Sequence, residues 1–421
     1  MKLHDRCKPF ASYIQAARRA GMYPYFRPIS RSCGPEVEVG SKRLVMVASN
    51  DYLGLSSDRR VKEKAAESLR RWGTGPGGSR FLCGNMTLHE TLEGRLAEFL
   101  GKKGVLVHTT GFGANLGAIG CLLEPGDVIL YDKENHASIY TGCRSSGARI
   151  VPFEHNDAAD AARKLARARE KHPRSCIFLI TEGVFSMSGD LAALPELAVL
   201  KENDPELFLY VDDAHGLGVF GRNGRGTADC FGMTQRVDFI MGTFSKALAS
   251  IGGFIASDDL DVLEYLRHSS KTLIFSAALP AVNVATVLAC LDILAEEPER
   301  IDRLHENARR ARDGYREIGL DVGKGETPIV PVRIGEEEKA YRFAVELFEN
   351  GIFAVPAVYP AVPRGNAIIR TAFMSTHEQH HLDRVLEVMD RLAGKYAVRI
   401  DDLYDAAGSC EADVPAAEGF S

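Results

Sequence analysis

Lys246 is the residue best placed for covalent chemistry in this chain. It stands in Gly242-Thr243-Phe244-Ser245-Lys246, directly after the apolar run 237–241 and shortly before Gly252-Gly253. A lysine that forms a Schiff base needs shielding from bulk water, a lowered pKa and small neighbours against which a flat cofactor can lie. The pattern favours pyridoxal phosphate (PLP) as that cofactor, although a surface lysine in a polar strand-to-helix loop fits the pentapeptide equally well by itself.

An acidic residue and a histidine form a second cluster at another strand end. Asp212 ends the apolar run 207–211, and His215 follows three residues later. A carboxylate there can keep a pyridine nitrogen protonated, which makes the ring an electron sink, and the histidine can hydrogen-bond the ring oxygen. A helix N-cap and a structural histidine are the alternatives. One further helix and strand separate Asp212 from Lys246, so we expect both to open onto one cleft.

Three weaker signals complete the pattern. In 109–115 an apolar strand feeds a helix through Gly111, so the helix start can hold a phosphate, although the glycine also fits an ordinary turn. His136 follows the strand 127–131 and could stack on a cofactor ring or be structural. Arg370 lies in a later strand, where its guanidinium could hold a carboxylate or form a surface ion pair. The order of the five signals along the chain favours one chemistry.

The segments that must position these residues are typical of an α/β fold. Short apolar strands alternate with helical stretches between about 104 and 256. This alternation predicts a mainly parallel sheet that is covered on both faces and binds its ligand at the carboxyl ends of the strands. The predicted strands are 104–108, 127–131, 176–180, 207–211 and 239–241.

Four segments divide the chain. Residues 1–55 are predicted to form an N-terminal arm that packs on another part of the protein, and 56–285 a large domain. A smaller α+β domain follows over 286–398, with strands near 329–334 and 367–372. The acidic, small-residue-rich tail 399–421 is predicted to be disordered.

Composition excludes several other classes of protein. The 421 residues are 45% hydrophobic and 26% charged, as in ordinary soluble globular proteins. A formal charge of −6 with no basic block argues against nucleic-acid binding. The sequence predicts a cytoplasmic protein, because it shows neither the apolar core of a signal peptide nor a stretch long enough to span a bilayer. Nine scattered cysteines without a Cys-x-x-Cys pair predict reduced thiols and no metal site.

Longer motifs resemble the α-oxoamine synthases, a family of PLP-dependent enzymes. The likeness runs from Ser49 to about Leu392, which is most of the chain. It implies the aspartate-aminotransferase fold (fold type I), with a large PLP-binding domain and a smaller C-terminal domain. It also implies a homodimer with active sites at the subunit interface. The matching segments are 49–55, 75–80, 88–93, 182–187, 221–226 and 242–246.

The resemblance also implies a role for each matching residue. Lys246 would form the Schiff base with PLP, Asp212 would pair with the pyridine nitrogen, His215 with the ring oxygen, and His136 would stack on the ring. Asn50 and Arg370 would hold the carboxylate of an amino acid. Further residues would contact the cofactor: Thr110, Gly111, Phe112, Ser186, Thr243 and Ser245, with Ser276 and Ala277 reaching the phosphate from the other subunit.

Four segments favour one branch of the family. The segments 136–140, 274–280, 360–365 and 369–374 are similar to bacterial serine palmitoyltransferases. That similarity implies condensation of L-serine with a long-chain acyl-CoA such as palmitoyl-CoA, or with an acyl carrier protein thioester. The products would be 3-ketodihydrosphingosine, CoA and CO2, the first step of sphingolipid synthesis. A lipid product implies peripheral contact with a membrane.

Asp213 favours a different branch. The run Asp212-Asp213-Ala214-His215-Gly216 resembles the 8-amino-7-oxononanoate synthases, whereas serine palmitoyltransferases usually carry Glu at its second position. Alanine with a pimeloyl thioester is therefore an alternative pair of substrates, and glycine C-acetyltransferase is another member of the family. A fold type I aminotransferase would use the same lysine and acid. A non-catalytic partner subunit would be expected to lack the lysine.

Overall fold

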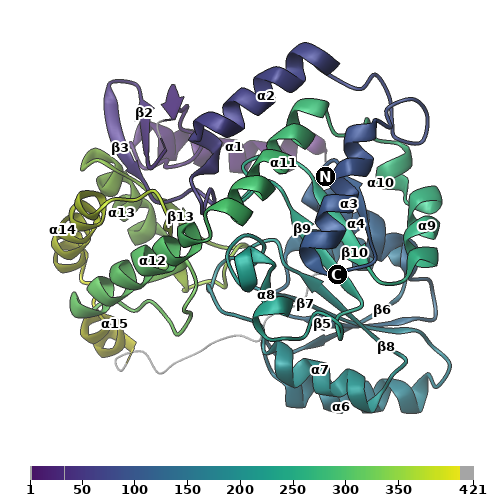
Figure 1. Cartoon of the computed structure of the whole chain (residues 1–421). Helices are drawn as coiled ribbons and strands as arrows, with labels where there is room; N and C mark the ends of the chain where they lie inside the picture. Colours follow the sequence, from purple (N-terminus) through teal and green to yellow (C-terminus); the bar gives the residue numbers. More distant parts are fainter. Residues whose placement is uncertain (1, 33, 408–421) are drawn as a thin grey trace.

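Three sheets organise the chain in the computed structural model, which describes residues 2–32 and 34–407. The largest has seven strands and lies at the centre of the large domain, on the right of Figure 1. Its strands, in spatial order, are β4 (Gly104–His108), β10 (Gly253–Ser257), β9 (Phe239–Thr243), β8 (Leu207–Asp212), β7 (Ile177–Glu182), β5 (Val128–Asp132) and β6 (Arg149–Phe153).

The sheet is mainly parallel, as the alternating pattern predicts. Strands β9, β8, β7, β5 and β6 pair in parallel with their neighbours. Strand β10 is the exception, because it runs antiparallel to both β4 and β9. All five predicted strands are present within one or two residues. The sequence pattern did not predict β6 and β10.

Helices cover both faces of this sheet, because side chains alternate along each strand. In β8, Leu209 and Val211 belong to one apolar cluster, whereas Tyr210 between them belongs to another. The first cluster includes side chains of α3 (Thr87–Leu100), α6 (Ala158–Lys171), α7 (Leu194–Asn203) and α11 (Ala281–Glu296). The second includes side chains of α4 (Gly111–Leu122), α5 (Ala137–Ser146), α9 (Leu260–Ser269) and α10 (Lys271–Ile274).

The smaller domain contains a three-stranded antiparallel sheet. Its strands are β11 (Ile329–Gly335), β14 (Ala367–Ala372) and β13 (Val355–Ala357), in that spatial order. Strands β11 and β14 lie where the sequence predicts them. The accompanying helices are α12 (Glu299–Glu317), α13 (Glu337–Glu349) and α14 (Gln379–Tyr396).

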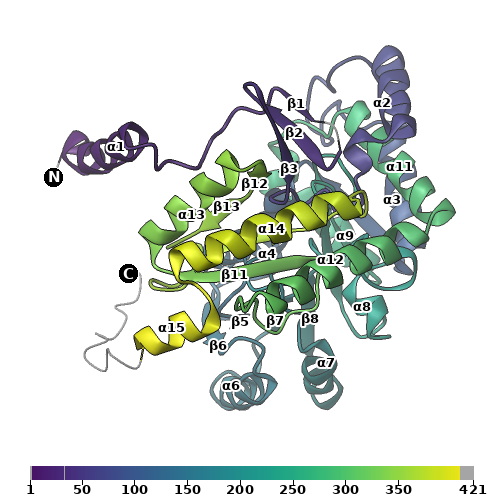
Figure 2. The same ribbon diagram turned by 90° about the vertical axis from the view of Figure 1, so that its left-hand side faces the viewer.

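Most of the N-terminal arm packs on this smaller domain. Strand β3 (Lys42–Met46) pairs in parallel with β12 (Ile352–Phe353), and completes a sheet with β2 (Glu36–Val39) and β1 (Arg31–Ser32). Helix α1 (Leu3–Arg19) buries none of its side chains and extends away from the body in Figure 2. The remaining short elements are η1 (Leu55–Ser57), α2 (Arg59–Trp72), η2 (Arg222–Gly224) and α8 (Thr227–Cys230).

The start of the predicted disordered tail is helical. Residues Ile400–Ala407 form α15. The rest of the predicted tail, 408–421, lies outside the described residues. The division of the chain at 55, 285 and 398 stays a prediction. No helix within the described ranges is long and apolar enough to cross a membrane.

Candidate active site

The predicted site residues gather at one edge of the central sheet, where its parallel strands end. Asp212 is the last residue of β8, and Glu182 is the last residue of β7 beside it, in register. His136 is the N-cap of α5, which follows β5, and Lys246 comes three residues after β9 ends. The parallel strands therefore bring side chains from four separate segments to one edge, as the sequence predicts.

The environment of Lys246 favours a reactive side-chain amine. Its Nζ has no hydrogen-bond partner within the ranges that the structure describes. Burial lowers the pKa of Lys246 to about 8, and the positive charge of Arg370 acts in the same sense, while Asp212 and Glu182 oppose it. A lysine with this pKa supplies the neutral, nucleophilic form near neutral pH.

His136, the predicted stacking residue, has a lowered pKa. His136 is exposed overall, which leaves room for a flat ring against it. Desolvation by the surrounding protein lowers its pKa, and the charge of Lys246 adds to this effect, while Asp212 opposes it. Its backbone N–H donates to the carboxyl group of Glu182, which fixes the start of α5.

A chain of hydrogen bonds joins the predicted ring-oxygen partner to the predicted carboxylate holders. Nδ1 of His215 lies 2.6 Å from the hydroxyl oxygen of Tyr52, which lies 3.3 Å from Oδ1 of Asn50. Nη2 of Arg370 donates to the same Asn50 oxygen at 3.0 Å, and its Nε donates to the backbone oxygen of Ser186 at 2.6 Å.

These contacts fix the protonation of the pair Tyr52 and His215. Burial raises the pKa of Tyr52 to about 12, although Arg370 opposes the shift, so the phenol keeps its proton. Burial, together with the charges of Lys246 and Arg370, holds the pKa of His215 well below its usual value. A neutral His215 that faces Tyr52 through Nδ1 can present Nε2–H to a ring oxygen.

The predicted phosphate site has the geometry of an anion cradle. Thr110 caps α4, because its hydroxyl oxygen accepts a hydrogen bond from the backbone N–H of Gly113 at 2.9 Å. A Cβ on Gly111 would lie 2.8 Å from the hydroxyl oxygen of Thr243, which lies 3.0 Å from that of Ser245. The start of α4 therefore lies close to the hydroxyls of Thr243 and Ser245, at a point where Gly111 has no side chain in the way.

Three predicted residues stay apart from this group. Phe112 is 47% exposed, and Ser276 and Ala277 follow α10 in a partly exposed loop. Across residues 2–32 and 34–407, none of the three forms a hydrogen bond with the other predicted site residues. The roles predicted for all of these residues stay predictions.

Asp213 does not face the site. Its carboxylate accepts hydrogen bonds from the backbone N–H and the hydroxyl of Thr227, at 2.7 and 2.8 Å. Glycines surround it so closely that a Cβ on Gly183, Gly216 or Gly226 would lie within 2.3 Å of its oxygens. Packing and two hydrogen bonds therefore enclose the side chain at this position.

Sequence reasoning missed three residues of the site as functional groups: Asn115, Tyr52 and Glu182. Each left a signal. Asn115 is the single strongly polar side chain in the apolar helix α4 and is fully buried. Glu182 ends an apolar strand, as Asp212 does. Tyr52 stands two residues after Asn50 in one of the family motifs.

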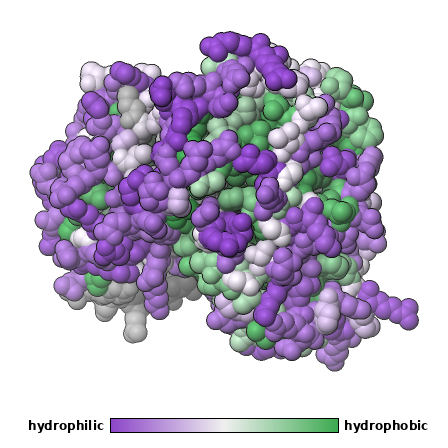
Figure 3. Space-filling view, in the orientation of Figure 1, coloured by the Kyte–Doolittle hydropathy of each residue, from purple (hydrophilic) through white to green (hydrophobic). Residues whose placement is uncertain are grey.

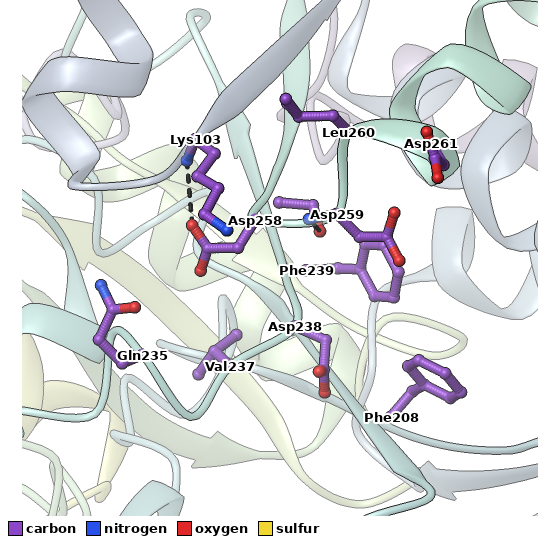
Figure 4. Close-up of a pocket in the computed structure, with 11 residues that line it drawn as sticks. Lys103, Phe208, Gln235, Val237, Asp238, Phe239, Asp258, Asp259, Leu260 and Asp261 are labelled. Atoms are coloured by element: carbon purple, nitrogen blue, oxygen red, sulfur yellow. Dashed lines mark hydrogen bonds between the residues drawn. The ribbon is translucent and has the colours of Figure 1, made fainter.

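A cavity of about 540 Å³ lies at the opposite edge of the sheet, where β8 and β9 begin and β10 ends (Figure 4). Three of its four carboxylates have hydrogen-bond partners. Asp258 accepts from Lys102 and from the backbone of Lys103, Asp238 from the backbone of Leu209, and Asp259 caps α9.

Comparison with known proteins matches this arrangement. The model of the aminotransferase class I and II family matches residues 42–389. The serine palmitoyltransferase of Sphingobacterium spiritivorum is 41% identical, over 93% of this chain and 96% of that protein. The 8-amino-7-oxononanoate synthase of Thermoanaerobacter pseudethanolicus is also 41% identical, over 90% of this chain and 95% of that protein.

Solved structures match over the same length. Sphingomonas wittichii serine palmitoyltransferase superimposes with a TM-score of 0.90 at 30% identity, over 95% of this chain and all of that one. A serine palmitoyltransferase variant from S. paucimobilis, solved with a bound PLP–myriocin aldimine, also gives a TM-score of 0.90 at 30% identity, over 94% of this chain and all of that one.

Proposed function

We propose a function from one premise: the chain belongs to the class I and II aminotransferase family and, within it, to the α-oxoamine synthases, which are PLP-dependent acyltransferases. The proposed reaction joins L-serine to a long-chain acyl-CoA such as palmitoyl-CoA, and releases 3-ketodihydrosphingosine, CoA and CO2. The observation that carries the chemistry is the unpaired amine of Lys246, placed at one strand edge with Asp212 and within the field of Arg370.

The choice of serine and a long acyl chain rests on the relatives. Four proteins named serine palmitoyltransferase are 41 to 44% identical to this chain over most of their length. Alanine with a pimeloyl thioester stays the second candidate, because proteins named 8-amino-7-oxononanoate synthase reach 41% identity.

The residues at the strand edge fit PLP. When bound, PLP supplies a conjugated ring that accepts the electron pair of a substrate Cα–H bond as that bond breaks. We assign Asp212 to hold the ring nitrogen, His215 to the ring oxygen and His136 to the ring face, with Ser186 as a further contact of the cofactor. The start of α4 at Gly111, with Thr110, Thr243 and Ser245, would hold the phosphate.

Arg370 and Asn50 orient the amino acid. The bonds from Arg370 to Ser186 and Asn50 fix the plane of its guanidinium group. Because Oδ1 of Asn50 accepts from Nη2 of Arg370, its Nδ2 group is left to donate to a substrate carboxylate. Fixing that carboxylate sets which bond at Cα faces Lys246.

Lys246 moves the proton. Its neutral amine takes the proton from the substrate Cα, so that Cα can form a bond to the acyl carbon as the CoA thiolate leaves. Loss of the carboxylate as CO2 frees Cα a second time, and the protonated Lys246 returns a proton there. The burial that lowers the pKa of this lysine to about 8 suits both directions of transfer.

We further propose a homodimer in which Ser276 and Ala277 complete the phosphate site of the partner. Apolar side chains around these residues support this assembly: Phe275 is 82% exposed and Leu82 is 79% exposed. Figure 3 shows apolar side chains gathered over the large domain on the face it presents. Sedimentation should give twice the mass of the chain, and mixing Lys246→Ala with Ser276 variants should restore one working site per mixed dimer.

We also propose that the protein works in the cytoplasm and touches a membrane peripherally, because its product is a lipid. Co-sedimentation with lipid vesicles tests this contact. Protein that stays in the supernatant with vesicles of every composition contradicts it.

Two experiments test the reaction. A matrix of serine, alanine and glycine against acyl-CoAs of increasing length, read by product mass, should give its largest signal for serine with a long chain. Preference for alanine with pimeloyl-CoA would establish the second candidate instead. Pyridoxamine phosphate formation without release of CoA and CO2 would identify an aminotransferase.

Lys246→Ala should remove the visible absorbance of the protein with bound PLP and essentially all turnover, because no other amine is assigned to this chemistry. The variant should retain the thermal stability of the cofactor-free parent. Turnover at the parental rate in Lys246→Ala contradicts the assignment.

A further inference from the structure

One buried amide contacts both the predicted ring-nitrogen acid and the group that holds the predicted stacking histidine. Nδ2 of Asn115 lies 2.7 Å from Oδ2 of Asp212 and 2.9 Å from the hydroxyl oxygen of Ser138. That hydroxyl oxygen lies 2.7 Å from Nδ1 of His136. The hydroxyl of Tyr210 donates to Oδ1 of Asn115 at 2.7 Å. Asn115 is fully buried on α4, and it joins groups from two other segments, β8 and the start of α5.

The contacts at the two ends of this row of hydrogen bonds, at His136 and at Asp212, determine which group is the donor in each bond. The backbone N–H of Ser138 approaches Nδ1 of His136 at 3.2 Å, and a backbone N–H can only donate, so Nδ1 is an acceptor. The Ser138 hydroxyl must then donate to Nδ1 as well. At the other end, Nδ2 of Asn115 is the donor in both of its contacts, to Oδ2 of Asp212 and to the hydroxyl oxygen of Ser138.

The two hydrogens of one NH2 group are therefore fully used. One goes to Asp212 and the other to Ser138, whose own hydrogen goes to His136. The hydroxyl of Ser138 has no other acceptor within the described part of the chain. A proton on Nδ1 of His136 would therefore face two donors.

We propose that Asn115 is a positioning residue, which ties Asp212 and His136 into one hydrogen-bond chain of fixed direction and so keeps His136 in the tautomer with its proton on Nε2. The proposal rests on the proposed function for what Asp212 and His136 act upon. The hydrogen bonds themselves are present in the protein without cofactor.

Charged groups on several elements influence the protonation of His136. Asp212 at the end of β8 favours its protonated form, whereas Lys246 after β9 disfavours it. Glu182 at the end of β7 binds its backbone N–H. Burial and the charge of Asp212 raise the pKa of Glu182 well above its usual value. The donors that Ser138 supplies at Nδ1 oppose the protonation of His136 that the charge of Asp212 favours.

The test follows His136 in the cofactor-free protein, by NMR of 13C-labelled histidine over a pH series, with His136→Asn to assign its signal. Ser138→Ala removes one donor to Nδ1, so the pKa of His136 should rise. Asn115→Leu should raise it too, because the Ser138 hydroxyl can then turn toward Asp212. The double variant should shift it no further than the larger single change, because both act in one chain.

Two phenol variants serve as controls of matched size. Tyr131→Phe removes a buried hydroxyl that bonds the backbone oxygen of Asn135 outside this chain, and it should leave the titration of His136 unchanged. Tyr210→Phe leaves both NH2 contacts of Asn115 in place and should produce a smaller shift than Asn115→Leu.

A second readout is cofactor affinity, measured by fluorescence titration with PLP. Asn115→Leu should weaken binding roughly 10- to 100-fold, the range found when a partner behind a ligand-holding side chain is removed. Ser138→Ala, which keeps the contact with Asp212, should weaken it less.

Unchanged His136 titration in both Ser138→Ala and Asn115→Leu would overturn the proposal. So would a loss of cofactor affinity in Asn115→Leu with additive shifts in the double variant, because Asn115 would then serve Asp212 alone. If Asn115→Leu fails to fold, Ser138→Ala still decides the direction of the chain. Failure of the proposed function shows instead as a different product in the substrate matrix, and leaves the titration in the cofactor-free protein as expected.

Discussion

Lys246 acquires its reactive form near neutral pH because the protein removes water from around it. With a pKa of about 8, the amine of the cofactor-free protein should capture PLP at a rate that rises with pH and levels off above pH 8. At pH 7 the rate should be roughly a tenth of its plateau, because about a tenth of the amine is neutral. Stopped-flow absorbance measures this rate.

Arg370→Gln serves as the control for that profile. Its charge helps to lower the pKa of Lys246, so its loss should move the midpoint of the rate profile upward. A midpoint near 10.5, the ordinary value for lysine, would contradict the described environment of Lys246 in the unchanged protein.

Asp213 is packed so tightly that one added methylene group should destabilise the protein. Asp213→Glu should cost about 1–3 kcal/mol in the free energy of unfolding, because Gly183, Gly216 and Gly226 leave no room around the carboxylate. Asp213→Asn keeps the shape, and its amide can accept from the backbone of Thr227 and donate to the hydroxyl. Denaturant unfolding should rank Glu well below Asn. Equal stabilities would contradict the described packing.

The same residue makes stability depend on pH. Burial raises the pKa of Asp213 to about 7, although Thr227 opposes the shift. Between pH 4 and 7 the folded state therefore holds a proton that the unfolded state has lost. Stability from this group is full below pH 4 and falls as pH rises to 7, by as much as about 4 kcal/mol. Asp213→Asn should flatten that part of the unfolding profile.

Sequence alone could predict the functional residues that lie in recognisable local motifs. Lys246, Asp212 and His215 each follow an apolar strand, so their motifs show chemical type and position together. Asn115 could not be assigned a role in this way, because its partners, Ser138, Tyr210 and Asp212, come from other segments. The surroundings of Asp213 could not be predicted for the related reason that Gly183 and Thr227, which enclose its side chain, come from other segments.

At the scale of elements, the approach of α4 to β9 controls the phosphate site. Gly111→Ala should weaken PLP binding, because its Cβ would lie 2.8 Å from the hydroxyl oxygen of Thr243 and 3.1 Å from Met241. Gly94→Ala in α3 is a matched control: its Cβ meets nothing within 4 Å, so it should leave affinity unchanged and stabilise the helix by about 1 kcal/mol. Equal PLP affinities for the two variants would contradict the described cradle.

Strands are predictable where their apolar runs are continuous. The five strands with such runs are present. Strand β6 carries Pro152 at the edge of the sheet, where proline is tolerated but obscures the pattern. Strand β10 begins at Gly253, and its antiparallel direction depends on pairing with β4, whose sequence lies far away. A local pattern does not contain that information.

At the scale of the molecule, the N-terminal arm and the smaller domain share one core. Val47, in the arm, is fully buried in a cluster with Tyr315 and Phe343 of the smaller domain. Its backbone bonds Phe353 and Ala372. Val47→Ala should therefore destabilise the smaller domain by about 2 kcal/mol, from the buried methyl groups lost.

Hydrogen exchange resolved by segment measures that effect, and faster exchange should appear in α12 and α13. Val39→Ala, at a partly buried position of the same arm, should have a smaller effect. Exchange confined to the arm would mean that the arm and the smaller domain do not share a core. This shared core was not predictable, because the sequence only indicates that the arm packs on another part of the protein.

The pairing of β3 with β12 also determines when the N-terminal arm can fold during synthesis. Val45 pairs with Ile352, 307 residues later, so the ribosome must make most of the chain before the arm finds its partner strand. At roughly 5–20 residues per second, the arm waits roughly 15–60 s with an open strand edge, which invites aggregation. Asn50 and Arg370 come together only after that delay. The proposed binding site for the substrate carboxylate therefore forms late in synthesis.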